Sequence, residues 1–160
     1  MKLLFFISLL LIIVSCSGPE NGSKNNDMPI PGIMFADTIS YPVIIKNPDT
    51  TDTWTTECLR PLNRKKLVDA VFEAVYSNNA QAYNYFTNEP MSVKNIKTLE
   101  ATEEFSRKNV GKLQFWESWY FDKKKQIFTK KVHKILVAYE VFTDEGVLRN
   151  YKAAFYIKLN

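Results

Sequence analysis

The spacing of apolar residues predicts two helices in the middle of the chain. Over residues 64–77 the apolar side chains recur three and four positions apart and therefore line one side of a helix, at Leu67, Val68, Val71, Phe72 and Val75. Asn63 is a typical residue for the start of this helix, and Pro61 supports the same start. Ser92 predicts the start of a second helix, with inward-facing Ile96 and Leu99.

The last fifty residues change to the period of a β-strand. Alternating side chains predict strands over residues 113–121, 127–142 and 147–159, separated by the charged turns 122–125 and 143–146. Large side chains stand on both sides of the first strand. We therefore predict an α+β fold, in which two N-terminal helices pack on a three-stranded antiparallel meander.

An apolar run at the N-terminus predicts export. Lys2 precedes the run Leu3–Val14, and small residues and Cys16 follow it. The run is shorter than the roughly 20 residues of a membrane-spanning helix and is typical of a secretory signal. Because residues 13–16 resemble a lipobox, we predict a lipoprotein signal peptide over residues 1–15 and lipid attachment at Cys16. Attachment of more than one acyl chain makes such an anchor stable.

The segment after Cys16 is predicted to be a flexible acidic tether over residues 16–57. It begins with a polar stretch, and four prolines follow. Two apolar segments, 33–35 and 41–45, interrupt it, and the pattern leaves open whether they dock on the domain or on a partner. A single globular domain is predicted over residues 58–160.

Charge is distributed unevenly between these parts. The whole chain carries a net charge of +4, but residues 16–57 hold two Lys and six acidic residues, whereas residues 58–160 hold 18 Lys or Arg and 11 acidic residues. A basic domain behind an acidic arm predicts an anionic partner or an anionic membrane face. The plainer alternative is a solvated basic surface.

The sequence carries no spacing typical of a catalytic or metal site. Its single histidine, His133, stands between lysines, and its glycines form no phosphate-binding pattern. Glu117 and Asp122 are interpreted as structural residues near a hairpin. Cys58 has no partner in the chain once Cys16 is acylated, which predicts a free thiol or an intermolecular disulfide. We expect no enzyme activity, no cofactor, no metal and no nucleic-acid partner.

An aromatic segment near the first strand carries a resemblance to a known family. The run Phe115–Lys125, with the sequence FWESWYFDKKK, leads into a strand that ends in Val137-Ala138-Tyr139. This arrangement resembles the gliding-motility protein GldN, also called PorN. The resemblance extends over roughly residues 64–160 and includes three shorter upstream matches, at Leu67–Val71, Ala82-Tyr83 and Met91-Ser92.

The resemblance implies a role without catalysis. GldN-type proteins belong to the type IX secretion and gliding machinery of Bacteroidetes-type bacteria, where they form a periplasmic ring with a lipoprotein called GldK or PorK. Family members are usually longer and lack a lipid of their own, so a chain with a lipid on Cys16 departs from the family and is similar to a short, self-anchored relative.

The function predicted from the sequence is therefore a non-enzymatic, lipid-anchored envelope protein, a structural or accessory subunit of a type IX secretion or gliding complex. Its predicted partner-binding residues are Trp116, Trp119, Tyr120, Phe121, Asp122 and Lys123. The alternative is a ligand-binding lipoprotein with an apolar pocket lined by Trp116, Trp119 and Tyr139. The predicted location is the outer membrane, on its periplasmic face, because Glu20 is the only acidic residue close behind Cys16.

Overall fold

The computed structural model describes residues 29–159. The predicted signal peptide and Cys16 lie outside this range. Three α-helices, one short 3-10 helix and six strands form the described part. In chain order they are β1 (Ile33–Ile44), α1 (Thr53–Leu59), α2 (Arg64–Tyr76), β2 (Ala82–Tyr83), β3 (Pro90–Met91), α3 (Val93–Glu100), η1 (Arg107–Asn109), β4 (Val110–Asp122), β5 (Ile127–Phe142) and β6 (Leu148–Lys158).

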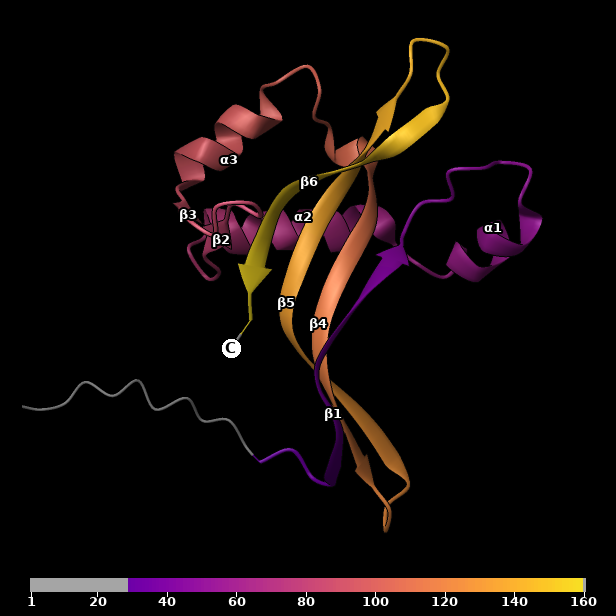
Figure 1. The fold of residues 1–160 in the computed structure, drawn as a ribbon, viewed down its shortest axis with the longest axis vertical. Coiled ribbons are helices and arrows are strands. Elements are labelled where there is room, and N and C mark those ends of the chain that lie inside the picture. The colour runs from indigo at the N-terminus through magenta and orange to yellow at the C-terminus, as the bar shows by residue number, and fades with distance from the viewer. Residues whose placement is uncertain (1–28, 160) are drawn as a thin grey trace, which may run out of the picture.

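All six strands belong to one antiparallel sheet with the order β1-β4-β5-β6-β2-β3. The long strands β4, β5 and β6 lie side by side, and β1 runs along the outer edge of β4 (Figure 1). In the centre of the sheet, Leu113 of β4 stands opposite Val137 of β5, which stands opposite Phe155 of β6.

The predicted fold class is wrong. The described residues are 43% strand and 24% helix, so the protein is mostly β, with six strands instead of three. The largest error concerns β1, which lies inside the segment 16–57 that was predicted to be a tether. Pairing between β1 and β4 makes residues 33–44 part of the sheet. The two-residue strands β2 and β3 are too short for any alternation to reveal them.

Individual elements do lie where the periodicity predicts them. Helix α2 begins after Asn63, whose side chain accepts a hydrogen bond from the backbone N–H of Lys66 at 3.0 Å. Helix α3 begins after Ser92, which forms a capping box with Asn95. Within residues 29–159 no helix has the length and apolar character that a membrane crossing requires.

The main core lies between the sheet and α2. Phe72 of α2 is fully buried and packs edge-to-face against Phe155 of β6, with ring centroids 5.1 Å apart. Phe105, in the loop before η1, contacts Phe72 and also packs against Tyr139 of β5. Through these contacts, the loop that follows α3 covers one side of the apolar core.

Three strands continue beyond this core as a projecting stalk. Pairing of β5 with β6 ends at Lys134 opposite Lys158, and Leu159 still donates a hydrogen bond to the carbonyl of His133. The residues of β5 before His133 have only β4 beside them. We call residues 33–39, 117–122 and 127–132 the stalk, and the rest of the described chain the head. In Figure 1 the stalk extends downward from the head, and the described chain begins beside its free end.

Candidate functional site

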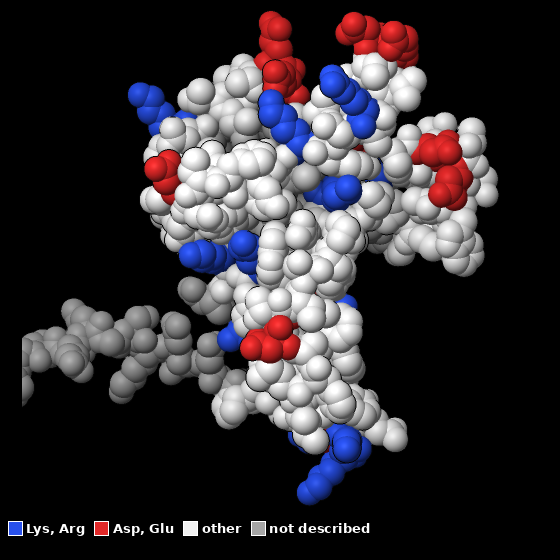
Figure 2. Space-filling view, in the orientation of Figure 1, with Lys and Arg blue, Asp and Glu red and all other residues white. Residues whose placement is uncertain are grey.

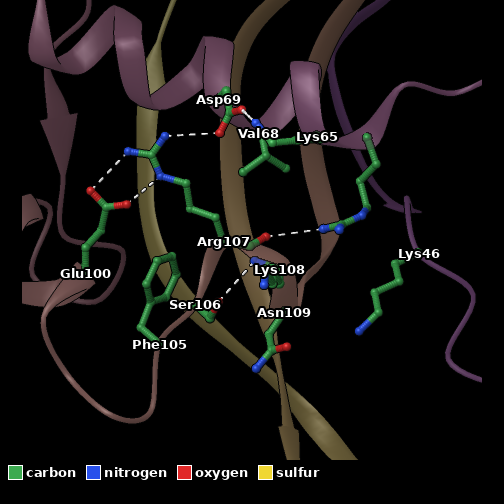
Figure 3. A pocket seen from close by; sticks show the side chains of 11 residues that line it. Lys46, Lys65, Val68, Asp69, Glu100, Phe105, Ser106, Arg107, Lys108 and Asn109 are labelled. Carbon is green, nitrogen blue, oxygen red and sulfur yellow. Dashed lines mark hydrogen bonds and ion pairs between the residues drawn. The ribbon is translucent and has the colours of Figure 1, made fainter.

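The head contains an open cleft of about 780 Å³ between α2 and the segment that leads from α3 into β4 (Figure 3). Its lining contains five cationic side chains and only two acidic ones. The lining residues are Lys46, Arg64, Lys65, Val68, Asp69, Glu100, Phe105, Ser106, Arg107, Lys108 and Asn109. The sequence prediction missed this cleft.

Arg107 organises one wall of the cleft. Its guanidinium lies over the ring of Phe72, 4.2 Å from the centroid, and donates to Asp69 at 3.1 Å. It also makes two hydrogen bonds to the carboxylate of Glu100, one of them at 3.1 Å. Tyr76 donates to Glu100 as well. Figure 3 shows Arg107 between the two acidic side chains, so its charge is already neutralised.

These ion pairs shift the pKa values of both partners. The hydrogen bond from Lys65, followed by that from Arg107, holds the pKa of Asp69 below its ordinary value. The hydrogen bond to Glu100 raises the pKa of Arg107, and the bond to Asp69 acts in the same direction. Asp69 and Arg107 therefore both stay charged near neutral pH.

The remaining cations give the cleft its net positive charge. The guanidinium of Arg64 donates to two backbone carbonyls, those of Arg107 at 3.2 Å and Val110 at 3.1 Å, which hold it in place without neutralising it. Lys108 is exposed on the opposite wall. Lys46 forms an ion pair with the buried Glu140. An anionic group on a ligand or partner suits this arrangement.

The predicted partner-binding residues do not form one patch. Trp116 and Tyr120 lie on one face of β4, whereas Trp119 and Phe121 lie on the other, because side chains alternate along a strand. Trp116 stacks with the ammonium group of Lys134 at 4.0 Å. On the opposite face, Trp119 lies next to the rings of Tyr41 and Phe128.

A buried carboxylate lies beside Trp119 at the base of the stalk. Glu117 is only 4% exposed, and its Oε2 accepts hydrogen bonds from the hydroxyl of Tyr41 at 2.7 Å and the indole of Trp119 at 3.0 Å. Lys130 approaches the same oxygen at 3.5 Å. Burial raises the pKa of Glu117, but the two hydrogen bonds and Lys130 outweigh burial, and the pKa lies below its ordinary value.

A serine, a histidine and an aspartate meet on the other face of the stalk. Ser118 Oγ lies 2.7 Å from Nε2 of His133 and 3.3 Å from Oδ1 of Asp37. This arrangement differs from a catalytic triad, because the carboxylate contacts the serine instead of orienting the histidine. Ser118 is also only 2% exposed, so a substrate cannot reach its hydroxyl. We interpret the cluster as a polar link between β1, β4 and β5.

Asp122 and Lys123 lie at the free end of the stalk. The carboxylate of Asp122 accepts hydrogen bonds from the backbone N–H groups of Lys124 at 2.9 Å and Lys125 at 3.1 Å, and so forms the β4–β5 turn. The side chains of Lys123, Lys124 and Lys125 are exposed. Figure 2 shows blue atoms at this end of the molecule.

The alternative pocket of three aromatic residues does not form. Trp116 and Trp119 stand on opposite faces of β4, and Tyr139 is buried in the head against Phe105, with ring centroids 5.2 Å apart. None of the three lines the cleft. The prediction grouped Trp116 with Trp119 because they are close in the sequence. Residues three positions apart on a strand point to opposite faces of the sheet.

Other candidate chemistry is sparse in the described residues. Within residues 29–159 no group of three His, Cys, Asp or Glu side chains is placed to hold a metal ion. Cys58 is exposed and has no disulfide partner there. Comparison with protein families and with curated proteins finds no match for this chain. The resemblance to GldN therefore stays a prediction.

Proposed function

We propose that this chain is a non-enzymatic, lipid-anchored envelope protein that holds a partner-binding head away from the membrane. One observation carries this proposal: the described chain enters the sheet at the free end of the stalk, where Ile33 of β1 stands opposite Phe121 of β4. The predicted lipid site, Cys16, precedes Ile33 by only 17 positions. An anchor at Cys16 places the end of the stalk near the bilayer and the cleft at the far end.

The head then presents its positive cleft to other envelope proteins. Arg64 and Lys108 carry charges there that no acidic side chain in the cleft lining neutralises. An acidic segment of a protein partner fits this chemistry. The particular assembly we propose is a type IX secretion or gliding complex, with a GldK- or PorK-like lipoprotein or another ring subunit as the partner. This step is supported only by the resemblance of residues 64–160 to GldN.

The proposal is tested on the full chain expressed in a Bacteroidetes-type bacterium. Mass spectrometry of the detergent-extracted protein should find acyl chains on Cys16, and a pull-down should recover a secretion or motility component with it. Protease treatment of intact cells should leave the protein uncut, as expected for the periplasmic face. Recovery of the acylated protein without any such component would contradict the assembly.

A charge reversal in the cleft tests the binding surface. Lys108→Glu should reduce recovery of the partner several-fold, and raised salt should reduce it for the wild type. Lys94→Glu is the matched control, because Lys94 is also exposed, lies on α3 and does not line the cleft. Equal recovery with both variants would show that the partner binds elsewhere.

A further inference from the structure

The free end of the stalk exposes an unusual concentration of apolar side chains. Five of the ten large apolar side chains that are exposed in the described residues lie there, with exposures between 48% and 61%. They are Ile33, Met34, Phe35, Ile127 and Phe128. We call these five residues, together with the turn 122–126, the stalk tip. The other five are scattered over the head, with Tyr85 and Phe86 as a pair, whereas a cluster of five indicates a binding surface.

The pairing of the strands places these side chains on both faces of the tip. Ile33 stands opposite Phe121, which stands opposite Phe128, so these three share one face. Met34 follows Ile33 and Ile127 precedes Phe128, so both point to the other face. Apolar side chains on both faces suit insertion of the tip into a surface better than contact along one side.

Basic and aromatic residues flank the apolar ones along the stalk: the lysines occupy the turn at its end, and the aromatic residues lie on the side toward the head. The turn carries three exposed lysines, Lys123, Lys124 and Lys125, against one acid, Asp122, whose carboxylate is held by backbone N–H groups. Trp119 and Tyr120 are the next residues of β4 in the direction of the head. Lysines bind anionic headgroups, and their long stems let the ammonium groups stay at headgroup level while the apolar side chains beside them enter the interface. Aromatic rings with a polar atom prefer the interfacial layer.

We propose that the stalk tip inserts into the surface of an anionic phospholipid bilayer. This inference rests on the proposed lipid anchor for its geometry. The 17 positions from Cys16 to Ile33 span at most about 55–60 Å when fully extended, and roughly 23 Å on average when flexible. An anchored chain therefore keeps the tip close to the bilayer, and a weak contact is sufficient to hold it there. Insertion fixes the stalk upright and directs the cleft away from the membrane.

The test uses a fluorescent label on the full, acylated chain in vesicles of phosphatidylcholine and phosphatidylglycerol. With Cys58→Ser as background, Met34→Cys places an environment-sensitive dye at the tip. Phe86→Cys is the matched control, because Phe86 is also exposed but lies in the head. We expect a shift to shorter emission wavelength and several-fold stronger quenching by brominated lipid at position 34 than at position 86. Equal quenching at both positions would overturn the proposal.

Charge variants test the role of the lysines. Replacing Lys123, Lys124 and Lys125 together with Gln should weaken quenching at position 34, whereas replacing Lys66, Lys94 and Lys97, which changes the net charge equally and leaves the cleft lining intact, should not. Equal loss in both triple variants would contradict recognition by the tip. A blue-shifted label at position 34 without vesicles, dependent on protein concentration, would instead assign the tip to a second copy of the chain.

Failure of the anchor is distinguishable from failure of the tip. If mass spectrometry finds no acyl chains on Cys16, the proposed function is wrong, and the same labelled protein is then titrated with added vesicles. The tip proposal still requires the label at position 34, and not at position 86, to respond to anionic vesicles and to respond less to phosphatidylcholine alone. No response at position 34 in acylated, vesicle-bound protein would refute the tip proposal and leave the anchor intact.

Discussion

The hydroxyl of Tyr41 donates a hydrogen bond to Oε2 of Glu117 across 2.7 Å, and this bond joins β1 to β4 at the base of the stalk. Lys130 donates to the oxygen of Tyr41 at 2.9 Å from the third strand. A buried carboxylate that has lost water needs such donors to stay ionised. The three side chains therefore connect β1, β4 and β5 at the base of the stalk.

Removing the hydroxyl of Tyr41 should weaken this connection. We expect Tyr41→Phe to lower the free energy of unfolding by about 1–3 kcal/mol, because Glu117 loses a donor and Lys130 loses an acceptor. Chemical denaturation measures the change. Tyr85→Phe is the control, because the Tyr85 ring is exposed and its hydroxyl makes no hydrogen bond within residues 29–159. An equal loss in both variants would contradict a special role for Tyr41.

The pKa of Glu117 predicts a specific dependence of stability on pH. Because this pKa is lower in the folded protein than the ordinary value of 4.5, the ionised carboxylate stabilises the fold at higher pH. That contribution is complete above the unfolded pKa and is lost as the pH falls through the folded pKa. Between about pH 6 and pH 3, the free energy of unfolding should fall less steeply in Glu117→Gln than in the wild type. Parallel curves would refute this assignment.

The sequence predicted those elements that bury one complete face. Helix α2 has an unbroken apolar stripe, and β5 and β6 alternate over many residues, so the period alone located them. Strand β1 lacked that signal because it is an edge strand with mostly exposed or half-buried residues. Its pattern is also broken by two register shifts and by Thr38, which has a positive φ of 51°. The apolar segments 33–35 and 41–45 were the only trace of it.

The candidate sites were harder to predict for two different physical reasons. The cleft draws its lining from α2, α3, η1 and the segment after β1, and such distant segments meet only after folding. The six predicted partner-binding residues are divided for the opposite reason, because a continuous run along one strand points alternately to its two faces. Only the last of them, Phe121, Asp122 and Lys123, lie together with the stalk tip.

Two cations that pair with the same acid should differ in their effect on stability. Both Lys65 and Arg107 bind Asp69, but the side chain of Lys65 is 86% exposed and that of Arg107 only 29%. We expect Lys65→Gln to cost less than about 1 kcal/mol. Arg107→Gln should cost roughly 1.5–3 kcal/mol, because Glu100 and Asp69 lose charged hydrogen bonds and Phe72 loses its stacked partner. Thermal or chemical unfolding of both variants decides this, and a larger loss for Lys65→Gln would contradict it.

The ion pair between Lys46 and Glu140 should be the most costly one to break. The side chain of Glu140 is 1% exposed, and within the described residues its Oε1 accepts no hydrogen bond, so Lys46 alone balances its charge. We expect Lys46→Met to lower the free energy of unfolding by about 3–5 kcal/mol, since it leaves an uncompensated buried carboxylate. Combining it with Glu140→Gln should recover part of this loss, because the second substitution removes the charge. If the loss in the double variant equals the sum of the losses in the two single variants to within about 0.5 kcal/mol, the two side chains do not depend on each other.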